Sequence, residues 1–139
     1  MISRLQLENI LFLDIETVPQ HEHFSDLDPE LQQLYADKTE YQRKDEYTAE
    51  AFYDRAGIWA EFGKIVCISV GYFHNTEQGR SFRTTSFHGD EKQQLLAFKK
   101  LLSEHYNKLQ HVLCAHNGKE FDFPFIARRM IINGIKLPF

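Results

Sequence analysis

At 139 residues, with 42% hydrophobic and 14% aromatic residues, the chain is long enough for a single domain with a sizeable core. Its 16 Lys and Arg residues are outnumbered by 20 Asp and Glu residues, which argues against a broad basic surface for nucleic acid. The sequence has neither an apolar run of about 18 residues nor a secretory signal pattern. We therefore expect no membrane span, no export and a cytoplasmic location.

The first predicted element is a strand over residues 7–17, which Pro19 ends. The end of this strand carries two carboxylates, Asp14 and Glu16, within the stretch ILFLDIETVP. Strand alternation sends positions i and i+2 to one face, so both would project together, where like charges repel unless they meet a cation. Two alternatives stay open: both side chains could point to solvent, or they could pair with Lys or Arg.

A polar, charge-rich segment over residues 20–63 follows, and we interpret it as a helical insert between the first two strands. Asp28, which precedes a proline, is typical of a helix start. Thr48 is typical of a second start, and Gly57 would end that helix. Residues 38–46 are predicted to form a charged, mobile linker between these two short helices.

The rest of the chain alternates strands with helices, which predicts a mixed α/β sheet with helices packed against it. The next two strands are predicted to form an antiparallel hairpin with a longish loop. The chain stops after an apolar run, IKLPF, so we expect residues 1–139 to be a single domain that is truncated at its C-terminus. The predicted elements are strands over 64–74 and 81–89 with a loop at 74–79, a helix from the Asp90 cap to about Tyr106, a strand over 111–117 and a helix over 121–134.

A third carboxylate, Asp122, falls at the start of the last helix, just after the predicted fourth strand. By itself Asp122 is typical of a helix cap. If strands one and four are adjacent, however, their ends lie together at the crevice where α/β proteins bind ligands. Three hard oxygen ligands there would suit Mg²⁺ or Mn²⁺, and two such ions can support phosphodiester hydrolysis.

The stretches FLDIET and HNGKEFDFPFI resemble the first two motifs of the 3′-5′ exonucleases with four acidic residues, the DEDD superfamily. More narrowly, DIET, GKIVCISVG and N-G-x-x-F-D look like the predicted exonucleases related to the exonuclease domain of family B DNA polymerases. The resemblance spans nearly the whole chain except the insert. It implies a ribonuclease H-like mixed sheet in which strands one to three are antiparallel and strand four is parallel to strand one, with a final strand and helix missing.

The resemblance also implies roles for individual residues. Asp14 would bridge two metal ions, Glu16 would bind the catalytic one near the terminal 3′-hydroxyl, and Asp122 would hold the second ion, mostly through water. The same three residues are the implied catalytic residues. The positions implied to contact substrate are Thr17, Asn117 and Phe121.

The family also needs a third motif, Tyr-x-x-x-Asp or His-x-x-x-x-Asp, which the 17 residues after Asp122 do not contain. We therefore expect a metal-dependent exonuclease domain whose present chain is inactive or impaired. The expected partner is the 3′ end of single-stranded or frayed DNA. An RNA-trimming enzyme of the same fold and a non-catalytic module that binds nucleic acid or a partner remain alternatives, and the oligomeric state is left open.

Two further groups of side chains could contact nucleic acid. Tyr53, Trp59 and Phe62 in the insert are candidates to stack an unpaired base, although packing of the insert onto the sheet is the favoured interpretation. The last helix and its flanks carry a local positive excess that could meet phosphates, although a solvated helix face explains it equally well. These basic residues are Lys119, Arg128, Arg129 and Lys136.

Overall fold

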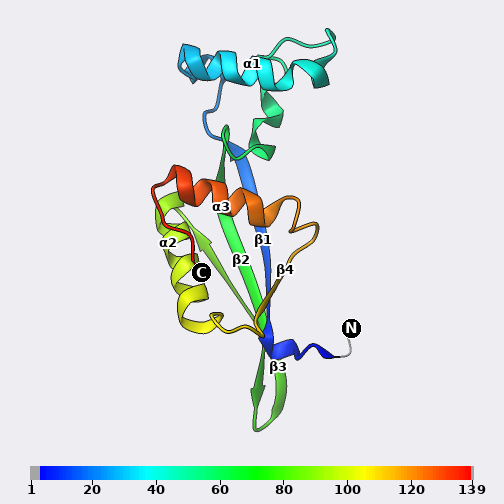
Figure 1. Cartoon of the computed structure of the whole chain (residues 1–139), viewed down its shortest axis with the longest axis vertical. Coiled ribbons are helices and arrows are strands. Elements are labelled where there is room, and N and C mark those ends of the chain that lie inside the picture. Colours follow the sequence, from blue (N-terminus) through cyan, green and yellow to red (C-terminus); the bar gives the residue numbers. More distant parts are fainter. Residues whose placement is uncertain (1–3, 139) are drawn as a thin grey trace. The chain divides into compact units, whose positions relative to one another are not determined.

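The computed structural model describes residues 4–138, which divide into two compact units. The insert unit is Thr17–Lys64, and the sheet unit combines the chain before it with the chain after it. Figure 1 shows the course of the chain through both. Among the described residues, no helix has the length and apolar character that a membrane crossing requires.

The sheet has four strands in the order β3-β2-β1-β4 (Figure 1). β4 runs parallel to β1, with Ile10 opposite Val112, and the other neighbours are antiparallel. The predicted mixed sheet, with the fourth strand parallel to the first, is confirmed. The strands are β1 (Ile10–Pro19), β2 (Gly63–Thr76), β3 (Gly79–His88) and β4 (Val112–Cys114).

The strand boundaries differ from the predicted ones by one to three residues, and three of the differences change the local structure. The first strand begins at Ile10, because Leu7–Asn9 form a 3₁₀ turn. The predicted loop at 74–79 is a tight turn, since Thr76 and Gly79 still pair and Gly79 adopts φ +117°. The fourth strand covers three residues instead of 111–117, because the chain already turns after Cys114.

Two helices, α2 (Glu91–His105) and α3 (Asp122–Ile132), pack with the sheet, and α2 contacts both β3 and α3 (Figure 1). Asp90 caps α2 as predicted, since its Oδ2 accepts from the Gln93 N–H at 3.1 Å. Burial of apolar side chains between the helices and the sheet is the main force that holds them together. The core of the sheet unit includes Leu11, Leu13, Ile15, Ile68, Leu95, Phe98, Phe125, Ile126 and Met130.

In the insert unit, α1 spans Pro29–Arg43, so the prediction of a linker over residues 38–46 is wrong for most of its length. Asp28 caps this helix as predicted. The helix continues because Thr39 is buried, donates to the Tyr35 carbonyl at 2.8 Å and accepts from Arg43 Nε at 3.0 Å. The predicted second helix is instead a 3₁₀ helix, Tyr53–Ile58, and Gly57 lies inside it.

The insert unit has an aromatic core of its own. The Tyr35 ring lies 5.4 Å from that of Tyr53 and 5.1 Å from that of Phe62, all edge to face. Trp59 packs against the same cluster. Since Tyr53 and Phe62 are 3% and 4% exposed, the idea that they stack an unpaired base is wrong. The buried cluster is Leu27, Tyr35, Phe52, Tyr53, Ala56 and Phe62.

Candidate functional site

β1 presents Asp14 and Glu16 on one face, in the middle and second half of the strand. The residues between and before them, Ile15 and Leu13, are buried, whereas both carboxylates are exposed. This alternation is the period of two that a half-buried strand requires. Within residues 4–138 neither carboxylate forms an ion pair with Lys, Arg or His, so the alternative of pairing with a base is not what the structure contains.

A tight turn after β4 delivers Asp122 to the start of α3. Asn117 adopts the left-handed conformation (φ +53°), and its carbonyl accepts from the N–H groups of Glu120 and Phe121 at 3.1 and 3.0 Å. Asparagine tolerates this region better than most residues. Gly118 follows because a Cβ there would lie only 2.6 Å from the Ala115 Cβ. The Asn-Gly pair of the second motif therefore has a structural reason.

Asp122 turns back to β1 instead of capping its own helix. Its side chain is 3% exposed, and Oδ1 accepts from the Ile15 N–H at 3.3 Å. β4 pairs only with Ile10–Phe12 of β1, so beyond that point a carboxylate takes the place of a strand carbonyl. The simple helix-cap interpretation of Asp122 is wrong, and its carboxylate lies against the segment that carries Asp14 and Glu16.

The surroundings of Asp122 disfavour its charge. Burial raises the pKa of this carboxyl above its usual value, and the nearby charge of Asp14 adds to the rise. Hydrogen bonds from its own N–H and from that of Ile15, together with the charge of His116, act in the opposite direction. A bound cation would stabilise the charged form of Asp122, which burial and the neighbouring carboxylate disfavour.

The donor chemistry fits a hard divalent cation, since all three predicted ligands are carboxylates. Within residues 4–138, however, no group of three or more His, Cys, Asp or Glu side chains is arranged to hold a metal ion. The assignment of Asp14, Glu16 and Asp122 as metal ligands therefore stays a prediction.

The three predicted substrate contacts have different surroundings. The Thr17 hydroxyl donates to the Gly57 carbonyl at 2.7 Å within the insert unit, so its proton is already used. The Asn117 side chain is exposed at the turn. The Phe121 ring is half-buried and lies 5.5 Å from that of Phe125. Asn117 and Phe121 thus both belong to the turn of the sheet unit that leads into Asp122.

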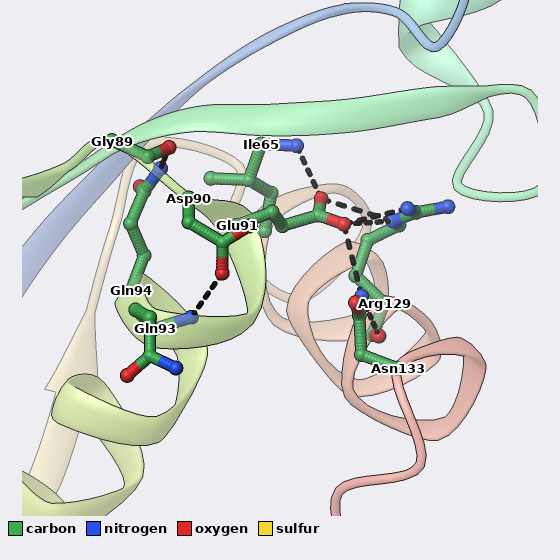
Figure 2. Close-up of polar contacts among 8 residues, drawn as sticks. All are labelled: Ile65, Gly89, Asp90, Glu91, Gln93, Gln94, Arg129 and Asn133. Carbon is green, nitrogen blue, oxygen red and sulfur yellow. Dashed lines mark hydrogen bonds and ion pairs between the residues drawn. The ribbon is translucent and has the colours of Figure 1, made fainter.

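Arg129 is the one basic residue of α3 for which the phosphate prediction fails. It is 4% exposed, and its guanidinium binds Glu91 through Nε and Nη2 (Figure 2). The sequence pattern did not identify Glu91, because its position next to the Asp90 cap suggested only the first turn of a helix. The acidic first-turn position was the one available signal.

The family comparison adds to this geometry. A family model described as the RNase_H superfamily matches residues 51–139, which include β2, β3, α2, β4 and α3 with Asp122. The match does not extend to Asp14 and Glu16, and a search of curated proteins found no match to the chain. Proteins of this superfamily are generally nucleases, and the fold generally binds nucleic acids. Because the match covers well over half of the residues and the sheet has the predicted topology, the chain belongs to the RNase_H superfamily.

Proposed function

We propose that this protein is a metal-dependent 3′-5′ exonuclease domain of the DEDD type, related to the exonuclease domain of family B DNA polymerases. The observation that carries the proposal is the hydrogen bond from the Ile15 N–H to Asp122 Oδ1. It joins residues 107 positions apart and brings the second-motif aspartate to the strand between Asp14 and Glu16. Two motifs that the resemblance connects in sequence are thus neighbours in space.

In this proposal Asp14, Glu16 and Asp122 hold two Mg²⁺ or Mn²⁺ ions when metal is present. Bound ions of this kind activate a water and stabilise the leaving oxygen of a phosphodiester. The protein contributes two carboxylates on a paired strand and one at a buried helix start. Because Asp122 lies out of water, its attraction to a cation is stronger than it would be at the surface.

The proposed substrate is the 3′ end of single-stranded or frayed DNA. Its terminal nucleotide would lie beside Asn117 and Phe121 of the sheet unit. The acidic charge balance of the chain agrees with local binding of one strand end better than with binding along a duplex. DNA is preferred over RNA through the resemblance to polymerase exonuclease domains, and a direct comparison of the two substrates tests that choice.

The fourth acidic residue of such a site is absent from the residues that follow Asp122, since 123–139 contain neither Asp nor Glu. A site with three of its four carboxylates binds cations less tightly and leaves the attacking water without an orienting group. We therefore expect weak metal binding and little or no trimming by the 139-residue chain.

Metal binding is the first test. Isothermal titration with Mn²⁺ at millimolar concentration should give heat with the unchanged chain, and the heat should disappear with Asp14→Ala, Glu16→Ala or Asp122→Ala. Asp28→Ala is the matched control, because Asp28 belongs to another Asp-x-Glu pattern but serves as the cap of α1. The absence of Mn²⁺ binding to the unchanged chain would remove the chemical basis of the proposal.

Cleavage is the second test, with 5′-labelled DNA and RNA oligonucleotides in Mg²⁺ or Mn²⁺. Products that shorten stepwise from the 3′ end and vanish with Asp14→Ala support the reaction, and ready trimming would contradict the expected impairment of this chain. A preference for RNA would favour the RNA-trimming alternative. Because little cleavage is expected of this chain in any case, oligonucleotide binding together with an absence of Mn²⁺ binding would favour a non-catalytic module.

A further inference from the structure

Glu91, the first residue of α2, lies at the centre of a buried polar network (Figure 2). Its Oε2 accepts from the Ile65 N–H at 2.6 Å and from Arg129 Nε at 3.0 Å. Its Oε1 accepts from Arg129 Nη2 at 2.6 Å and from Asn133 Nδ2 at 2.9 Å. The side chains of Glu91 and Arg129 are 11% and 5% exposed, so one carboxylate links α2, β2 and α3 away from water.

This network restrains α3 in a way that apolar packing does not. The other buried side chains of α3 include Phe125, Ile126 and Met130, whose contacts are stabilising but largely non-directional. A guanidinium that meets a carboxylate through two nitrogens fixes orientation as well as distance. The pair of Glu91 and Arg129 therefore restrains the rotation of α3 about its axis and its position along that axis.

Asp122 lies at the opposite end of the same helix, seven positions before Arg129. Seven residues are about two turns, or roughly 10 Å along the axis. At 3.3 Å, the bond from the Ile15 N–H to Asp122 is already near the limit of a hydrogen bond. A slide of α3 by about 0.5 Å that moves Asp122 away from Ile15 would break that contact. A rotation of α3 about its axis by one residue, roughly 100°, would break it as well.

We propose that Glu91 is a positioning residue that acts through Arg129 to fix α3 and thereby holds Asp122 against β1, beside the segment with Asp14. The consequence for catalysis rests on the proposed function, whereas the placement of Asp122 does not. Arg129 accordingly serves the site by anchoring its helix and does not contact phosphate.

Gln94 provides a matched control on the same helix. It is 2% exposed, and its Nε2 donates to the Gly89 carbonyl at 2.8 Å (Figure 2). The same nitrogen donates to the Val66 carbonyl at 3.3 Å. Within residues 4–138, the side-chain hydrogen bonds of Gln94 run to β2 and to the residue before the Asp90 cap, and none runs to α3. Gln94→Ala should therefore weaken the attachment of α2 to the sheet without releasing α3.

The experiment uses the 139-residue chain labelled with ¹⁵N-isoleucine. The Ile15 amide signal is assigned by its loss in Ile15→Val, and Asp122→Ala provides its position when the hydrogen bond is absent. We expect Glu91→Gln and Arg129→Lys to move this signal toward the Asp122→Ala position. Gln94→Ala should leave it at its original position. In titrations with Mn²⁺, Glu91→Gln should weaken affinity by about 10-fold, as substitutions outside the ligand set of a metal site commonly do.

An Ile15 signal that stays in place in both folded variants would overturn the proposal, as would an equal displacement in Gln94→Ala. If Glu91→Gln does not fold, Arg129→Lys decides, because it keeps the charge and loses only the two-point geometry. If neither folds while Gln94→Ala does, Glu91 serves the whole fold and the positioning role is rejected. If the unchanged chain binds no Mn²⁺, the proposed function fails, and the Ile15 signal still decides the role of Glu91.

Discussion

Removal of the Glu91 carboxylate by Glu91→Ala should be among the most destabilising single changes in the sheet unit. The substitution removes the Glu91 carboxylate from the Arg129 guanidinium, which is 5% exposed, and takes the acceptor from the Ile65 N–H. Breaking a buried ion pair from one side costs about 3–5 kcal/mol, because the remaining charge stays desolvated. We expect a loss of this size in the free energy of unfolding at pH 7.

Urea denaturation measures this loss, and Glu104→Ala is its control. Glu104 lies on the same helix and pairs with Lys100 at 3.9 Å, but both side chains are more than half exposed. An exposed pair of this kind is worth about 0.5 kcal/mol or less. If Glu91→Ala costs no more than Glu104→Ala, the inference from burial to stability is wrong.

A double variant distinguishes the cost of leaving one charge of the pair buried from the contribution of side-chain packing at the same site. In Glu91→Gln with Arg129→Met, the amide oxygen can still accept from the Ile65 N–H, and no buried charge is left unpaired. Replacement of a whole buried pair is often near neutral, whereas removal of one partner is not. We expect the double variant to be more stable than Glu91→Gln or Arg129→Met alone, and an additive loss would contradict this reasoning.

The pH dependence of stability follows from the same carboxylate. Burial by itself would raise the pKa of Glu91, but hydrogen bonds from Arg129, Ile65 and Asn133, with the charge of Arg129, hold it below the usual value of 4.5. A lowered pKa in the folded state contributes stability above pH 4.5 that is lost as the pH falls through the folded-state value. Acid titration of the unfolding free energy should show this loss in the unchanged chain and a smaller one in Glu91→Gln.

Three further changes test other parts of the structure. Asp122→Asn should raise the melting temperature at pH 7, because burial raises the pKa of Asp122 and disfavours its charged form. The gain should fade as the pH falls toward 3.8, where the carboxyl becomes protonated. No gain at pH 7 would contradict the raised pKa. Asn117→Val should cost about 1–2 kcal/mol in urea denaturation because Asn117 has φ +53°, whereas Asn117→Gly should be nearly neutral; equal losses would exclude backbone strain as the cause. Tyr35→Phe should lower the free energy of unfolding of the insert unit by about 1–3 kcal/mol, because the buried hydroxyl donates to the Phe52 carbonyl at 2.7 Å. Near-ultraviolet circular dichroism follows the unfolding of this unit, and an unchanged denaturation midpoint would show that the bond is unimportant.

Features that depend on neighbouring residues were predictable from the sequence. Asp28 and Asp90 each bind an N–H three residues away, so the cap pattern contains all the information that the contact needs. The alternation through Asp14 and Glu16 likewise follows from the geometry of a single strand. The parallel pairing of β1 with β4 was implied by the family resemblance, and it places Asp122 near β1.

Features that depend on distant partners were not predictable. The continuation of α1 through Thr39 needs the buried surroundings of Tyr35, which polar composition does not reveal. Arg129 pairs with Glu91, which lies 38 positions earlier in the sequence. Without knowledge of that partner, a basic residue on a helix suggests a solvated face. That Asp122 would bind Ile15 and leave its own helix uncapped depends on how short β4 is, which the apolar pattern of residues 111–117 overstated.

The contact of Asp122 with Ile15 also has a consequence for association between chains. Where β4 ends, the backbone of β1 would present an N–H to any extended chain able to pair with it, and open strand edges of this kind promote aggregation. A side-chain carboxylate that takes this N–H offers no peptide group in return, so it satisfies the strand without extending the ladder. Asp122 thus protects the edge of β1 at the position where the strand could otherwise pair with a strand of another chain. This protection does not depend on any chemistry that the carboxylate performs.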